Sequence, residues 1–242
     1  MKFSEYVQYD GLGLAELVKS KQVHPSELLK IALERTDKVN PKLNAIIIPM
    51  YEQAKQRAQQ ESSGLFAGVP FLVKDLFQEY QGIPTSYGSQ ALKKINYTPD
   101  FNAEIVNRWE QTGIITFGRT NTPEFGIKGI TEPDAWGACH NPWNLKHNSG
   151  GSSGGSGAAV AGGIVPVAGA GDGGGHARGA AATAAAAGAG AAGALRRRAL
   201  RGRAGRGPAQ GVGSFRRRTS PVRLSQPWPS AASARLKSPC PP

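Results

Sequence analysis

The chain changes character at about residue 176, and this change limits how much of it can form a folded domain. Residues 176–242 contain 12 arginines, one lysine and 18 alanines but no aspartate or glutamate. Their larger apolar side chains are limited to one Phe, one Trp, four Leu and two Val. Such a segment cannot bury enough apolar surface to offset the entropy cost of ordering its backbone. We therefore expect residues 176–242 to be a disordered, low-complexity tail and any fold to lie within residues 1–175.

The basic character of the chain comes entirely from this tail. The net charge is +12, but residues 1–175 hold 16 of the 29 basic residues and all 17 acidic ones, a net charge of −1. The arginine runs 196–198 and 216–218 could neutralise phosphates in a salt-dependent, sequence-independent way. Because the tail has few aromatic side chains on which bases could stack, we predict only non-specific nucleic-acid binding.

Neither a secreted, disulfide-stapled fold nor a membrane protein is indicated. The chain has two cysteines, Cys139 and Cys240, and its first residues lack the basic and then apolar regions of a signal peptide. The most apolar stretch, residues 158–171, is shorter than the roughly 20 residues that span a bilayer. We expect a reduced, cytoplasmic protein with no membrane segment.

The first 117 residues alternate between helical and extended patterns, which predicts an α/β fold with a buried sheet. Helix signals occur at residues 12–18, 25–40, 51–61 and 104–111, and short apolar runs of strand length at residues 45–48, 69–73 and 114–117. Pro25 suits the first turn of the second helix, and Pro41 is expected to end it. In the last of these helices, Ile105, Val106 and Trp109 are expected to face the core.

A glycine- and serine-rich segment at residues 148–157 has two interpretations. An isolated run of this composition is usually a flexible linker. Here it lies between an aromatic turn at residues 136–144 and an apolar pattern that predicts a short helix at 158–161 and a strand at 164–167. No Gly-Lys-Ser/Thr follows, so the segment is not a phosphate-binding loop.

Four separated motifs, in order, together resemble the amidase signature family. They are GVPFLVKD at 68–75, GRTNTPEFG at 118–126, NPWN at 141–144 and the glycine- and serine-rich run at 150–157. Residues 131–137 further resemble the branch that includes 6-aminohexanoate cyclic-dimer hydrolase. The resemblance covers about residues 10–175. It implies an α/β/α sandwich around a mixed twisted sheet, of which residues 1–175 are the N-terminal part of a truncated domain.

The resemblance also implies a chemistry and the residues that perform it. The family hydrolyses a small-molecule carboxamide through an acyl-serine intermediate, without cofactor or metal. Lys74 and Ser152 match two members of its Ser-Ser-Lys triad, with Ser152 following a cis peptide bond and Ser153 supporting it by a hydrogen bond. An amine can take the nucleophile's proton through Ser152 and return it to the leaving amine. Gly173, Gly174 and Gly175 match the oxyanion hole.

The position of the nucleophilic serine is occupied by His176. Histidine could be an alternative nucleophile, but its planar ring would not place a nitrogen where the serine oxygen lies. The chain could also be a pseudoenzyme that has lost only its nucleophile. Everything after residue 176 departs from the family pattern, however, which favours a change of reading frame at about this codon or a joined foreign sequence. We therefore expect residues 176–242 to be non-native and this chain to be inactive.

Two further functions stay open. The amidase subunit of a tRNA-dependent amidotransferase shares the same core motifs, and a polyanion-binding protein would use the arginine tail.

Asp75 either holds the surroundings of Lys74 in place or caps a following helix, and Glu124 is interpreted as a first-turn helix acid. Cys139, His140 and His147 do not have the spacing of a tetrahedral metal site and are interpreted as loop residues.

Overall fold

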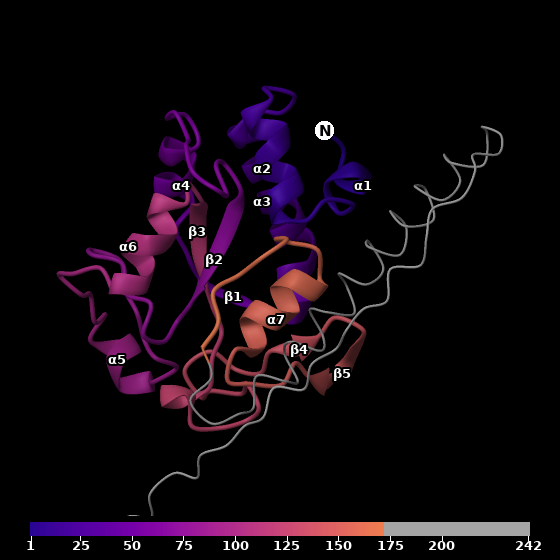
Figure 1. The fold of residues 1–242 in the computed structure, drawn as a ribbon. Helices are drawn as coiled ribbons and strands as arrows, with labels where there is room; N and C mark the ends of the chain where they lie inside the picture. Colours follow the sequence, from indigo (N-terminus) through magenta and orange to yellow (C-terminus); the bar gives the residue numbers. More distant parts are fainter. Residues whose placement is uncertain (172–242) are drawn as a thin grey trace, which may run out of the picture. The chain divides into compact units, whose positions relative to one another are not determined.

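The structure, a computed structural model, describes residues 1–171 (Figure 1). The helices are α1 (Phe3–Tyr6), α2 (Gly11–Lys19), α3 (Pro25–Leu43), α4 (Tyr51–Arg57), α5 (Gln90–Lys94), α6 (Glu104–Gln111) and α7 (Gly154–Ala161), with a short 3-10 turn η1 (Glu124–Gly126). The strands are β1 (Ile46–Pro49), β2 (Pro70–Lys74), β3 (Ile115–Thr120), β4 (His140–Asn141) and β5 (Asn144–Asn148). The predicted tail, the three oxyanion-hole glycines and His176 lie outside the described residues.

The centre of the fold is a mixed three-stranded sheet with the order β1-β3-β2. Strand β3 runs parallel to β2 and antiparallel to β1, and β4 and β5 form a separate antiparallel pair. All five residues of β2 and all six of β3 are buried. Burial on both faces is typical of parallel strands covered by helices on both sides. Strand β2 is apolar up to Lys74, whereas β3 also buries Thr116, Arg119 and Thr120.

Two apolar clusters on opposite faces of the sheet make the fold an α/β/α sandwich, in agreement with the expected fold class. One face presents Leu72, Ile115 and Phe117 to α3, α4 and α7. The other presents Phe71 and Val73 to Trp109 of α6. Figure 1 shows α6 and α7 on opposite sides of the strands. Because neighbouring residues of a strand point to opposite faces, the run Phe71-Leu72-Val73 contributes side chains to both apolar clusters.

The predicted helix at residues 25–40 forms, but Pro41 does not end it. Helix α3 begins with Pro25 in its first turn and continues through Pro41 to Leu43. A proline in the last turn of a helix removes only one backbone hydrogen bond. The end is instead set by Asn44, which adopts a left-handed φ of 50°, and by the Asn40 side chain, whose Oδ1 accepts from the Ala45 and Ile46 amides at 2.9 Å.

Four other local predictions were wrong in part. Helix α4 ends at Arg57 rather than at residue 61. In α6, Val106 is buried but Ile105 is 41% exposed, because the helix is short and contacts the sheet through one stripe of side chains. In β1, a strand at the edge of this sheet, Ile47 and Ile48 are half-buried. Residues 164–167 are not a strand, and Pro166 within this stretch has no N–H to donate to a neighbouring strand.

No helix within residues 1–171 is both long enough and apolar enough to cross a membrane.

The sandwich predicts a large difference between two leucine substitutions. Leu72 on β2 is fully buried, whereas Leu65 is 66% exposed. Leu72→Ala leaves a cavity between the sheet and its helices and should lower the free energy of unfolding by about 2–5 kcal/mol. Leu65→Ala should change it by less than about 0.5 kcal/mol. Urea unfolding followed by circular dichroism checks both, and equal effects would contradict the assignment of the core.

Candidate active site

The structure brings Lys74 and Ser152 together, although 78 residues separate them. Lys74 is the last residue of β2, and its Nζ donates a hydrogen bond of 2.7 Å to Ser152 Oγ. Both residues are buried, with exposed fractions of 2% and 4%. The peptide bond between Gly151 and Ser152 is cis. A lysine amine and a serine hydroxyl in direct contact can exchange a proton.

Ser153 also lies at this site and contacts the end of the described chain. Its Oγ donates to the Gly171 carbonyl oxygen at 2.9 Å and accepts from the Gly171 amide at 3.1 Å. Lys74 Nζ donates to the same carbonyl oxygen at 3.0 Å. Gly171 therefore ties Lys74 and Ser153 to the segment that leads into Gly173–Gly175. Those three glycines and His176 lie outside the described residues.

The glycine- and serine-rich run is a packed part of the domain, so the linker interpretation is wrong. Residues 151–159 are all buried. Thr122 Oγ1 donates to the Ser152 carbonyl oxygen at 3.0 Å, and Thr131 Oγ1 donates to the Gly150 carbonyl oxygen at 2.7 Å. Glycine is required at position 155, because a Cβ there would lie 2.3 Å from the Asn121 backbone nitrogen. This contact seats α7 directly against the end of β3.

A buried ion pair lies beside the site. Arg119 on β3 and Asp75, which follows Lys74, are both 0% exposed, and Arg119 Nε lies 4.0 Å from Asp75 Oδ1. Asp75 accepts hydrogen bonds from the Thr85 and Ser86 hydroxyls and from the Ser86 amide. Arg119 Nη1 donates to the Gln78 carbonyl oxygen at 2.9 Å. The pair thus holds the loop that leaves β2 after Lys74.

Burial is the main influence on both charges of this pair. It raises the pKa of the Asp75 carboxyl, and the Arg119 guanidinium and the hydrogen bonds from Ser86 and Thr85 oppose the rise. Burial likewise lowers the pKa of Arg119, and Asp75 opposes that change. Arg119 Nε and Nη2 have no hydrogen-bond partner among the described residues. A buried ion pair with unsatisfied donors contributes little stability but is costly to break, because either partner alone would be an isolated buried charge.

Arg119, Thr122 and Thr131 contribute to the site, although no sequence motif had indicated a role for them. The available signal was an arginine that directly follows the apolar run Ile114–Phe117 and Gly118, because a charge buried in a strand needs a partner. Of the two interpretations of Asp75, the structure agrees with the first: no helix directly follows it, and its carboxylate organises the loop beside Lys74. Glu124 is the exposed first residue of η1.

No group of three or more histidine, cysteine, aspartate or glutamate side chains within residues 1–171 is arranged to hold a metal ion. Cys139 is fully buried, and burial raises the pKa of its thiol to about 12. His140 is half-buried on β4, and His147 is exposed on β5.

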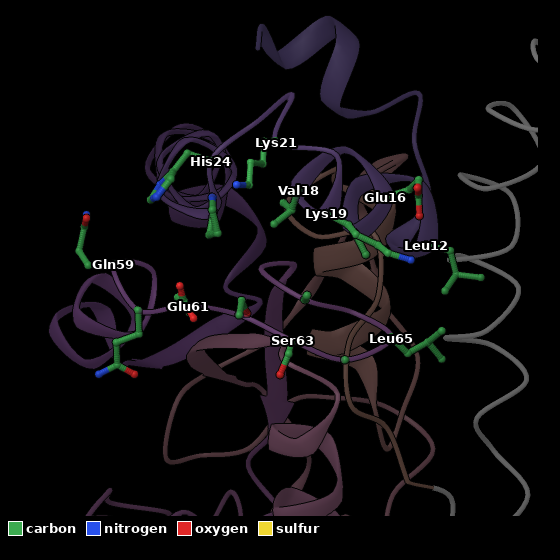
Figure 2. Close-up of a pocket in the computed structure, with 16 residues that line it drawn as sticks. Leu12, Glu16, Val18, Lys19, Lys21, His24, Gln59, Glu61, Ser63 and Leu65 are labelled. Carbon is green, nitrogen blue, oxygen red and sulfur yellow. The ribbon is translucent and has the colours of Figure 1, made fainter.

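A hollow of about 750 Å³ lies elsewhere in the fold, between α2, the start of α3 and residues 59–67 (Figure 2). Its lining includes charged side chains of both signs, such as Lys21 and Glu61, and Figure 2 shows Lys21 and His24 on one side and Glu61 and Ser63 on the other. Ala67 at its edge precedes β2, whereas Lys74 is at the far end of that strand. Neither Lys74 nor Ser152 lines this hollow, so it is separate from the candidate site.

Comparison with known proteins gives consistent matches. A family model described as Amidase matches residues 27–189, a range that includes Gly173–Gly175 and His176. The 6-aminohexanoate-cyclic-dimer hydrolase of Paenarthrobacter ureafaciens is 46% identical over 169 residues, which are 70% of this chain and 34% of that protein. Lipoamidase of Enterococcus faecalis is 41% identical over 177 residues, which are 72% of this chain and 24% of that protein.

A solved structure of 6-aminohexanoate cyclic dimer hydrolase superimposes with a TM-score of 0.65 at 45% sequence identity. The match covers 67% of this chain and 33% of that one. The chain thus spans about a third of the length of the hydrolases it matches. The family model covers well over half of this chain, and the solved structure shares its fold. The chain therefore belongs to the amidase signature family.

Proposed function

We propose that residues 1–175 are the N-terminal part of an amidase domain that hydrolyses a small-molecule carboxamide through an acyl-serine intermediate. The observation that carries this proposal is the 2.7 Å hydrogen bond between Lys74 Nζ and Ser152 Oγ in a buried setting. Two buried proton-exchanging groups in contact suit general acid–base chemistry. Membership of the amidase signature family supports an amide as the bond that is cleaved.

In the proposed reaction, Lys74 and Ser152 act as a proton relay. Uncharged Lys74 accepts a proton from the Ser152 hydroxyl, which takes one from the nucleophilic serine as the serine oxygen attacks the amide carbon. The tetrahedral intermediate collapses, the C–N bond breaks, and the relay returns the proton to the leaving amine. Water, deprotonated by the same relay, then attacks the acyl-serine and releases the carboxylic acid and the serine hydroxyl. The chemistry requires no cofactor.

Backbone amides are proposed to stabilise the negative oxygen of the tetrahedral intermediate. Gly173–Gly175 have the composition for this task, because glycine lets several N–H groups point at one oxygen. The contacts of Gly171 with Lys74 and Ser153 support this assignment, because Gly171 lies two residues before Gly173 and is hydrogen-bonded to the proposed relay.

The nucleophile is the part of the reaction that this chain does not supply in the expected form. The family model match includes position 176, where this chain has histidine instead of serine. We propose that the coding sequence has changed frame there and that the chain as written has little or no amidase activity. The substrate class proposed for the lineage is a small linear or cyclic amide, because a relative of 46% identity is named for a cyclic dimer of 6-aminohexanoate.

A chimera tests the relay independently of position 176. Residues 1–171 of this chain replace the matching third of the Paenarthrobacter hydrolase, which supplies its own nucleophile, and hydrolysis of the 6-aminohexanoate cyclic dimer is measured. We expect turnover, and Lys74→Ala or Ser152→Ala should reduce kcat about a hundredfold to ten-thousandfold because proton transfer is lost. Lys55→Ala, at an exposed lysine, is the matched control. Full turnover by the Lys74→Ala chimera would exclude the relay.

The proposed frame change predicts a specific DNA sequence. Sequencing across codons 165–185 and translating all three frames should show another frame that continues after the three glycines Gly173–Gly175 with serine and then arginine and proline. The expected result for the purified chain as written is hydrolysis of amides and esters no faster than that of its Lys74→Ala variant. Robust turnover that Lys74→Ala abolishes would show that the chain is competent with His176.

A further inference from the structure

Four aromatic side chains form one connected cluster. The ring of Tyr87 is at its centre, with centroid distances of 5.6 Å to Phe77, 6.3 Å to Tyr97 and 6.3 Å to Phe125. The rings are tilted or edge-on to one another, which is the arrangement that aromatic pairs prefer. Phe77 is 66% exposed and Phe125 is 47% exposed. The cluster therefore presents aromatic surface outward instead of filling the core.

The backbone next to Phe125 joins this cluster to the surroundings of Ser152. Phe125 is followed by Gly126, and a Cβ built on Gly126 would lie 3.7 Å from Ser152 Oγ and 2.5 Å from Leu76 Cδ2. The Phe125 amide donates to the Tyr87 carbonyl oxygen at 2.7 Å, so the two loops that carry these rings are joined. Neighbouring backbone contacts thus connect the aromatic cluster to the serine hydroxyl that Lys74 contacts.

Three of the four rings are carried by backbone in the left-handed region. Phe77, Tyr87 and Phe125 have φ angles of 56°, 52° and 48°. Bulky residues seldom adopt this conformation, and such strain concentrates at functional sites and ligand clamps. Packing of the core does not explain it here, because Phe77 and Phe125 are among the exposed side chains.

Hydrogen bonds fix the loop that carries Phe77 and Tyr87. Asp75 accepts hydrogen bonds from Thr85 and Ser86, and this closes the loop that carries Phe77 and Tyr87. The Tyr87 hydroxyl donates to the Glu79 carboxylate, and burial, reinforced by Glu79, raises the pKa of Tyr87. A surface that is already ordered loses little conformational entropy when a ligand binds.

We propose that Phe77, Tyr87 and Phe125 form a binding surface for a planar aromatic group of the amide substrate, beside Ser152. A ring stacked there places its attached amide next to the serine, whereas a saturated ring of similar size stacks less well. The proposal rests on the proposed amidase function and adds the substrate class: amides with an aromatic ring joined directly to the amide nitrogen or carbonyl carbon.

The test compares pairs of probes that differ in planarity. Binding of acetanilide and N-cyclohexylacetamide to the full chain is measured by NMR titration, and benzamide and cyclohexanecarboxamide form a second pair with the ring on the acyl side. In at least one pair, the aromatic probe should bind about threefold to tenfold more tightly. Phe125→Leu should remove this preference. Phe101→Leu is the matched control, because Phe101 is 48% exposed, and it should leave the preference unchanged.

Phe125→Gly separates the role of the ring from that of the backbone. Glycine adopts a φ of 48° without strain, so this variant should melt at the same or a higher temperature and yet lose the aromatic preference. Lys74→Ala in the full chain should keep the preference, which distinguishes a failure of this proposal from a failure of the relay. Equal affinities within both pairs, no binding of any probe, or a preference that survives in Phe125→Gly would overturn the proposal.

Discussion

Two long basic side chains, Lys74 and Arg119, are buried at one end of the central sheet and determine how the loops around them are arranged. Lys74 and Arg119 are 2% and 0% exposed, and a charge or amine in such a place needs hydrogen-bond partners. Lys74 donates hydrogen bonds to Ser152 and to the Gly171 carbonyl. Arg119 donates one to the Gln78 carbonyl and forms an ion pair with Asp75. The cis-linked Ser152 loop and the loop after β2 are both positioned by this requirement.

The same requirement connects the core to the proposed chemistry. The apolar run Phe71–Val73 is buried on both faces of the sheet, and this burial carries Lys74 to the edge of the core. The Asp75–Arg119 pair then closes the following loop, which carries Phe77 and Tyr87. A single strand end thus supports the proposed relay on one side and the proposed aromatic surface on the other.

Local sequence patterns correctly predicted the strands and helices whose formation depends mainly on their own residues. The strand ending at Lys74 and the helix Glu104–Gln111 follow from apolar runs and helix signals, and both formed. The extent of α3 did not follow, because Asn40 overrides the signal of Pro41 through contacts with residues beyond the helix. The missing strand at residues 164–167 depends on strand pairing, which the half-buried Pro166 limits because it has no N–H to donate.

In the candidate site, too, the sequence indicated some residues but not the contacts between distant parts of the chain. A resemblance of motifs identified Lys74 and Ser152, but no local pattern could show that residues 78 positions apart are in contact. Arg119 was missed because its role exists only once β3 lies beside the loop after β2. The left-handed φ angles of three aromatic residues were equally invisible, because bulky side chains normally predict the opposite conformation.

A double-mutant cycle between Lys74 and Ser152 tests the central contact most directly. The free energies of unfolding of the full chain, Lys74→Met, Ser152→Ala and the double variant are measured in urea. A hydrogen bond between the buried pair predicts a coupling energy of about 1–3 kcal/mol. Effects that add within about 0.5 kcal/mol, or a chain without a cooperative unfolding transition, would contradict the account.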